Sequence, residues 1–316
     1  MTKKRSQKAV DLSVNIGILK LANPVMVASG TFGGAFDNIL DVDKLGAVII
    51  KTVTLHPRKG NPPPRIVETP SGLVNSIGLE NKGLDAFVKD ELPRLSKYKT
   101  KLIISISGKN ADEYIAIVEK LNNYDRIDAL ELNISCPNVS GGMDYGTNPE
   151  LTESVVNAVK NISRFFVIAK LTPNVTDITK IASAAINGGA DAISLINTIK
   201  ALPVDWRKSS PRLGGITGGL SGPAIKTVAL RFVWEVASRF NIPIIGIGGI
   251  ADANDVLEFM CVGASAVQVG TANFVDCTVT EKILNELPLL LAKEGITDIN
   301  SVIRSFKVKF DGSQCH

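Results

Sequence analysis

The hydrophobic residues of this chain fall into short, nearly continuous runs separated by amphipathic stretches. Strands buried on both faces of a parallel sheet have such runs, because neither face alternates with polar residues. Eight runs are predicted to be core strands: 24–29, 47–52, 102–107, 129–134, 166–171, 192–197, 243–248 and 266–270. Helical spacing of apolar positions predicts helices between them, over 111–123, 149–162, 177–189 and 222–240.

Strand and helix alternate about eight times, which predicts a (β/α)8 barrel of the TIM type. A doubly wound sheet is the alternative. No linker or low-complexity segment interrupts the pattern, so residues 1–316 are expected to form a single domain. Residues 14–24, which precede the first strand, predict a small hairpin that closes the bottom of the barrel.

Three connections are longer than a simple loop and helix require: 53–101, 135–165 and 198–242. Insertions that follow barrel strands commonly build the active site. The first contains the proline-rich stretch HPRKGNPPPR, which is expected to be stiff and extended. In the second, the glycine-rich residues 137–148 are predicted to form a mobile lid.

Composition and charge exclude several classes of function. The net charge is only +4, and no basic stripe interleaved with aromatic residues is present, which argues against nucleic-acid binding. The four cysteines form no CxxC pair and only two histidines occur, so neither a zinc site nor a disulfide scaffold is expected. No signal peptide and no apolar run approaching ~18 residues is visible, so a cytoplasmic enzyme without a membrane span is expected.

Polar residues and glycines stand at the carboxyl end of nearly every predicted strand, where barrels place their catalytic groups. They are Ser29, Lys51, Thr52, Ser105, Asn133, Cys136, Lys170, Asn197, Thr198, Gly248, Gly249, Gly270 and Thr271.

Lys51 and Lys170 each end an otherwise apolar strand. A buried ammonium is costly without a partner, so each lysine either pairs with a core carboxylate or meets an anionic ligand. Two lysines that converge on one cavity favour the ligand. The N1–C2 edge of a reduced flavin or a substrate carboxylate would suit them.

Glycine turns follow the last two predicted strands, in GIGGIAD and VGTANF, and a third lies in GLSGPAIK. Turns of this kind expose backbone N–H groups that bind phosphate, typically after strands 7 and 8 of a barrel. The alternative is that they are only tight turns. A dinucleotide fingerprint is rejected, because the βαβ setting and the spaced acidic partner are missing.

Asparagines recur near the same ends, at Asn75, Asn133, Asn138 and Asn197. Asparagine both donates and accepts hydrogen bonds, as a planar ligand with imide and amide edges requires. Each one could instead cap a turn. Asn75 opens the stretch NSIGLEN, in which Gly78 lets the backbone approach a ligand.

Cys136 lies two residues after a predicted strand and has no histidine near it in the sequence. A thiolate in this position can act as a general base that takes a proton from carbon. The ordinary thiol pKa of about 8.5 makes it a better base in alkali. Cys261, Cys277 and Cys315 are interpreted as packing or tail thiols.

Together these stretches resemble class 1 dihydroorotate dehydrogenases, over residues 12 to 305. Class 1 enzymes have a cysteine where class 2 enzymes have a serine. Ile77 and GLSGPAIK are more similar to class 1B than to class 1A. The matching motifs are NPVMVASGTFG, KTVTLHPRKGNPPPR, NSIGLEN, LELNISCPN, AKLTPN, INT, GGLSGPAIK, IPIIGIGGI and GASAVQVGTANF.

The resemblance implies a barrel that binds FMN and oxidises (S)-dihydroorotate to orotate in pyrimidine biosynthesis. Cys136 would remove the C5 proton, with Lys51 as the second catalytic residue, and the C6 hydride would pass to flavin N5. FMN would be held by Ser29, Lys51, Thr52, Asn133, Lys170, Ile196, Gly222, Gly248, Gly249, Gly270 and Thr271. Orotate would be held by Lys51, Asn75, Ser76, Ile77, Gly78, Leu79, Asn133, Asn138, Asn197 and Thr198.

The resemblance also implies partners. Class 1B enzymes work with a second subunit that carries FAD and a [2Fe–2S] cluster and passes electrons to NAD, and a homodimer of this chain is expected. Ser105 departs from the family, which often has asparagine there, so its flavin contact is not expected to be kept.

Three other functions are weighed against this one. They are a related FMN barrel acting on dihydropyrimidines, an aldolase-like barrel with Lys170 as a Schiff base, and a non-catalytic binding protein.

Overall fold

Eight parallel strands close into a barrel in the computed structural model, which describes residues 9–33, 39–135 and 145–308. All eight coincide with the predicted runs, so the barrel is confirmed and the doubly wound alternative is wrong. In order around the barrel they are β10 (Ala192–Leu195), β15 (Ile244–Ile247), β16 (Ala266–Val269), β3 (Val25–Val27), β4 (Ala47–Val53), β7 (Lys101–Ile106), β8 (Ala129–Asn133) and β9 (Phe166–Lys170).

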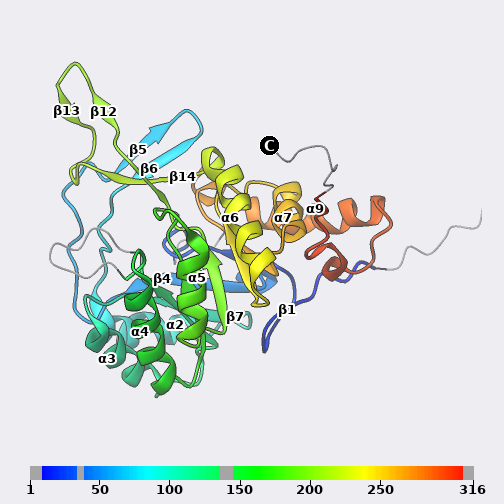
Figure 1. The fold of residues 1–316 in the computed structure, drawn as a ribbon, viewed down its shortest axis with the longest axis horizontal. Helices are drawn as coiled ribbons and strands as arrows, with labels where there is room; N and C mark the ends of the chain where they lie inside the picture. Colours follow the sequence, from blue (N-terminus) through cyan, green and yellow to red (C-terminus); the bar gives the residue numbers. More distant parts are fainter. Residues whose placement is uncertain (1–8, 34–38, 136–144, 309–316) are drawn as a thin grey trace, which may run out of the picture.

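Helices cover the outside of the barrel, and neighbours along the chain pack on each other from α3 to α7, with α9 on α7 (Figure 1). Helix α4 spans the predicted residues 149–162, because Asn148 caps it by accepting from the Leu151 N–H and Pro149 opens its first turn. The helices are α1 (Gly83–Ala86), α2 (Leu92–Leu95), α3 (Ala111–Leu121), α4 (Pro149–Ile162), α5 (Ile178–Asn187), α6 (Lys226–Arg239), α7 (Ala253–Cys261), α8 (Ala272–Val275) and α9 (Val279–Lys293). Short 3-10 helices are η2 (Val42–Lys44), η4 (Pro223–Ile225) and η5 (Ile299–Val302), and η3 (Phe87–Glu91) is a π-helix.

The predicted hairpin closes the bottom of the barrel. It consists of β1 (Val14–Ile16) and β2 (Leu19–Leu21), which pair antiparallel. Its turn residue Gly17 lies against Phe166 and Pro243, at the amino ends of β9 and β15. Ile16 is fully buried there, so the hairpin seals the apolar core at the end opposite the predicted site.

The two longest insertions pair with each other in a way that the sequence did not predict. Strands β5 (Ile66–Thr69) and β6 (Gly72–Asn75) come from the first insertion, and β11 (Ile199–Ala201) and β14 (Gly218–Ser221) come from the third. They form one antiparallel sheet in the order β11-β14-β6-β5. A further hairpin, β12 (Val204–Asp205) with β13 (Ser210–Pro211), extends beyond it (Figure 1). We call the four-stranded sheet the insertion sheet.

None of the helices in the described ranges is long and apolar enough to cross a membrane.

Candidate functional site

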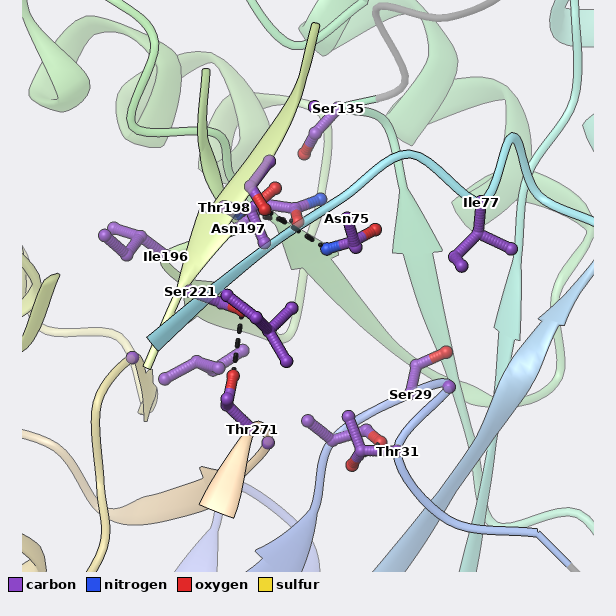
Figure 2. Close-up of a pocket in the computed structure, with 18 of the residues that line it drawn as sticks. Ser29, Thr31, Asn75, Ile77, Ser135, Ile196, Asn197, Thr198, Ser221 and Thr271 are labelled. Carbon is purple, nitrogen blue, oxygen red and sulfur yellow. Dashed lines mark hydrogen bonds between the residues drawn. The ribbon is translucent and has the colours of Figure 1, made fainter. Parts of the chain in front are cut away.

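A cavity of about 500 Å³ lies at the carboxyl ends of the barrel strands, between the barrel and the insertion sheet. Strands β4, β8, β9 and β15 contribute described residues to its wall, and the residues that directly follow β3, β10 and β16 also line it. The insertion sheet supplies the facing wall, for example Ile66, Leu73 and Gly219. Figure 2 shows side chains from both parts pointing into the same space, including Ser29, Asn75 and Asn197. The cavity therefore lies where a barrel enzyme holds its ligand.

Most residues that the sequence singled out line this cavity. They are Ser29, Lys51, Thr52, Asn75, Ile77, Gly78, Leu79, Asn133, Lys170, Ile196, Asn197, Thr198, Gly222, Gly248, Gly249, Gly270 and Thr271. Cys136 and Asn138, and residues 137–144 of the predicted lid, lie outside the described residues. Ser135 lines the cavity, so the described chain reaches the wall one residue before the cysteine.

The Ser76 side chain does not line the cavity, although the resemblance placed it in the orotate pocket. It is buried on the other side of its strand end, where Ser76 Oγ lies 2.9 Å from Asn61 Nδ2. The physical reason is alternation: successive residues of an extended segment point to opposite sides, and Asn75 and Ile77 already face the cavity. Ser76 anchors the segment 75–79 from behind.

A chain of hydroxyl and amide groups crosses the floor of the cavity. Thr52 Oγ1 lies 3.3 Å from Ser29 Oγ and 2.9 Å from Ser105 Oγ, and it accepts from Asn133 Nδ2 at 3.4 Å. Asn133 Oδ1 accepts in turn from Asn197 Nδ2 at 3.4 Å. These contacts orient donors and acceptors from β4, β8 and the end of β10 toward one space.

Ser105 is fully buried and is bonded to Thr52 rather than exposed on the cavity wall. The expectation that Ser105 does not keep a flavin contact stays a prediction.

Lys170 pairs with a core carboxylate and also lines the cavity. Its ammonium lies 3.4 Å from Glu131 Oε1, so the core-carboxylate alternative is correct for this lysine. Lys170 also lines the cavity, and 8% of its surface is exposed. The sequence reasoning missed Glu131, whose only signal was one carboxylate inside the apolar strand run ALELN.

Lys51 also lines the cavity, near the end of β4, which is three strands away from β9 around the barrel. Gly30 packs against it so closely that a Cβ atom added there would be 3.2 Å from Lys51 Nζ. Two lysine side chains, from β4 and β9, thus line the cavity, which suits an anionic ligand.

Two glycine turns, at Gly222 and Gly249, line another part of the cavity together with Thr271, and we call these residues the cradle. Gly222 and Gly249 have φ of +99° and +73°, a region that other residues rarely adopt. A Cβ on Gly249 would lie 2.9 Å from the Gly222 carbonyl oxygen, so the two turns touch. Thr271 joins them, because its hydroxyl donates to Ser221 Oγ at 2.8 Å (Figure 2).

Ion pairs between α6 and α7 hold the turns that carry Gly222 and Gly249 in place. Lys226, at the start of α6, lies 2.6 Å from Asp255 Oδ1 and 2.9 Å from Glu258 Oε2 on α7. Asp255 Oδ2 also accepts from the Ala251 N–H at 2.7 Å, which holds the turn after β15. Hydrogen bonds to these two carboxylates raise the pKa of Lys226, so it stays charged.

These features fit a flavin mononucleotide. The cradle at Gly222, Gly249 and Thr271 has no side chain at its two glycines, which fits a phosphate that the backbone must approach closely. The lysines and the hydroxyl and amide chain fit a planar ring with polar edges and a developing negative charge. The amide groups of the asparagines in the wall, such as Asn75 and Asn197, offer donors and acceptors for a second, smaller planar ligand.

Comparison with known proteins gives a consistent result. A family model described as Dihydroorotate dehydrogenase matches residues 11–291. The chain is 50% identical over 301 residues to the catalytic subunit of dihydroorotate dehydrogenase B (NAD(+)) of Geotalea daltonii, covering 94% of this chain and 99% of that protein. The proteins of the same name from Phocaeicola vulgatus and Desulforudis audaxviator are 49% and 50% identical, covering 94% and 93% of this chain and 99% and 97% of their own length.

Proposed function

Because this chain belongs to the dihydroorotate dehydrogenase family, we propose that it oxidises (S)-dihydroorotate to orotate in pyrimidine biosynthesis as the catalytic subunit of a class 1B enzyme. The match runs nearly end to end in both chains, and three relatives with the same name support the class.

The observation that carries this proposal is the convergence of three asparagines on one cavity. Asn75, Asn133 and Asn197 come from β6, β8 and the residues after β10, and all three line the wall. The amide and imide edges of orotate need groups that both donate and accept. We propose that these asparagines, with Asn138, Thr198 and the segment 77–79, hold the pyrimidine ring, and that Lys51 pairs with its carboxylate.

FMN is the proposed cofactor, and when bound it supplies the acceptor for the hydride from C6 of the substrate. The turns at Gly222, Gly248 and Gly249, together with Gly270 and Thr271, would hold its phosphate. The ring would be held by Ser29, Lys51, Thr52, Asn133, Lys170 and Ile196.

Cys136 is the proposed general base. Its thiolate would accept the proton from C5 of the substrate. Ser135 supports this assignment, because it lines the cavity and Cys136 is the next residue in the chain.

The test is the replacement of Cys136 by alanine, with reduction of bound flavin by dihydroorotate followed in a stopped-flow instrument. The rate should fall by roughly 10²-fold or more while FMN stays bound, because general-base catalysis contributes about that much. The wild-type rate should rise with pH as the thiol loses its proton. Cys261→Ala is the matched control, since this free thiol lies on α7, away from the cavity. Normal reduction by the Cys136→Ala protein would refute the base assignment.

The Schiff-base alternative would need Lys170 as a free amine that attacks a carbonyl. Its ammonium is instead paired with Glu131 in a buried position, which favours the oxidoreductase. Another alternative is a related FMN barrel that acts on dihydropyrimidines. Comparing uracil-type dihydropyrimidines with dihydroorotate as substrates distinguishes the two enzymes.

For the electron acceptor we propose NAD, reached through a separate subunit that carries FAD and a [2Fe–2S] cluster, with this chain as a homodimer at the centre. The relatives' names, which contain both NAD(+) and catalytic subunit, support a separate subunit and NAD as the acceptor. Copurification of a yellow-brown flavoprotein with this chain is the expected result. Efficient turnover of the isolated chain with fumarate would contradict it.

A further inference from the structure

Glu131 lies inside the barrel, one layer below the cavity, and no part of it is exposed. Its carboxylate is held by three side chains. Gln268 Nε2 donates to Oε2 at 2.6 Å, Ser194 Oγ donates to the same oxygen at 3.0 Å, and Lys170 Nζ lies 3.4 Å from Oε1.

The geometry of these four residues is that of a built site. Glu131, Ser194 and Gln268 come from β8, β10 and β16, the fourth, sixth and eighth barrel strands along the chain, and all three are fully buried. Side chains from alternate strands form one layer of a barrel interior, which is normally apolar. Gln268 Oε1 has no hydrogen-bond partner among the described residues. The Gln268 amide is thus oriented so that its NH2 group bonds Glu131 while its oxygen stays unbonded.

Stability alone does not account for this arrangement. A buried ion pair is commonly no more stabilising than apolar residues of the same volume. Lys170 is the only one of the four that also lines the cavity. Among these four residues, Lys170 connects the Glu131 carboxylate with the cavity, so Glu131 would act on a ligand there through the Lys170 ammonium.

We propose that Glu131 is a positioning residue that fixes the Lys170 ammonium at the cavity floor and sets how strongly this charge favours a reduced flavin. This inference rests on the proposed function, since it takes FMN as the ligand. With Glu131 ionised, the pair is neutral as a whole, and Lys170 stabilises an anionic ring less than an unpaired lysine would. The hydrogen bonds that Ser194 and Gln268 donate to Glu131 stabilise its negative charge and weaken its effect on Lys170.

The test is Glu131→Gln, which keeps the shape and removes the charge. The measured quantity is the ratio of the FMN dissociation constants of the oxidised and reduced protein, obtained from the midpoint potential. The reduced form should gain about tenfold in relative affinity, which is a rise of about 30 mV for a two-electron couple. Gln268→Met should move the ratio in the opposite direction, by about threefold, because it removes a donor from the carboxylate and leaves the ion pair in place. This second variant tests the idea even if the first does not fold.

Asp191→Asn is the control. Asp191 precedes β10 at the far end of the barrel and pairs with Lys160, so it should change stability without changing the ratio. The effect of Glu131→Gln should also shrink to about threefold or less in a Lys170→Met background, because it acts through that lysine. A ratio that stays at the wild-type value in both Glu131→Gln and Gln268→Met, or a full shift without Lys170, would overturn the inference.

The wild-type protein separates the two possible failures. If it binds no FMN, the proposed function fails before any variant is made. If it binds FMN and is reduced by dihydroorotate, but the variants keep its potential, only the role of Glu131 fails.

Discussion

Gly249 and Gly295 have the same φ of +73° but different surroundings. A Cβ on Gly249 would lie within 2.9 Å of the Lys226 backbone nitrogen and the Gly222 carbonyl oxygen. A Cβ on Gly295 would have no neighbour within 4 Å. The pair therefore separates backbone strain, which both positions share, from the closure of the cradle, which concerns only Gly249.

Replacing each glycine by alanine should have two distinguishable results. Both variants should lose about 1–2 kcal/mol of folding free energy from the positive φ, as measured by urea denaturation of the apoprotein. Only Gly249→Ala should also weaken FMN binding, by more than about tenfold, because its turn must shift away from Gly222. Fluorescence quenching of FMN measures this. Equal FMN affinities in the two variants would show that the cradle does not hold the phosphate.

At this scale the sequence predicted the cavity wall well, because a polar residue at the end of an apolar strand is costly to bury unless it meets a ligand or a partner. It failed for Ser76 and Glu131. Ser76 stands among predicted contacts, and only the alternation of the segment turns it away. Glu131 sits inside a strand, and nothing in one sequence tells which carboxylate lies beside Lys170 once the barrel closes.

The elements divide into those specified locally and those specified by their neighbours. Barrel strands and helix α4 were predicted from apolar periodicity and caps, which are local signals. The insertion sheet was not, because β14 has the sequence GGLS and pairs with β6 from a segment far away along the chain. Glycine weakens a strand pattern, and such pairing follows from tertiary packing rather than from propensity.

Helices α6 and α7 are joined by Lys226, and this contact should be measurable. Lys226→Met should lower the free energy of unfolding by about 1–3 kcal/mol at pH 7, because Asp255 is largely buried and loses a charged donor. Lys282→Met is the control, since its ion pair with Asp276 is exposed and should contribute little.

The pH dependence of this loss follows from the sign of the pKa shift. The pKa of Lys226 is raised in the folded protein by its hydrogen bonds to Asp255 and Glu258. Its contribution is therefore complete below the ordinary lysine pKa and is lost only as the pH rises above about 10.4. Urea midpoints of variant and wild type should differ by a constant amount from pH 6 to pH 9. A difference that disappears within this range would contradict the assignment.

At the scale of the whole molecule, the site depends on segments from most of the chain. Its wall contains residues from Ala28 to Phe274, including residues of the first and third insertions, which form the insertion sheet. The two ends of the described chain are also tied together, by a bridge between Asp11 and Asp298 and by Asn300 Nδ2, which donates to the Ser13 carbonyl oxygen. A ligand that contacts many strand ends at once should therefore stabilise the whole barrel rather than one loop.

Thermal unfolding of the apoprotein with added FMN tests this coupling. A ligand that binds only the folded state at 100 times its Kd stabilises it by about 2.7 kcal/mol, which should raise the Tm by roughly 5 °C. Riboflavin offers the same ring without the phosphate, so at equal concentration it should raise the Tm less. Because the cradle at Gly222 and Gly249 is the proposed phosphate site, the advantage of FMN over riboflavin should disappear in Gly249→Ala and persist in Gly295→Ala. If riboflavin and FMN stabilise the wild type equally, the phosphate does not bind in the cradle, and the glycine turns only close the barrel loops.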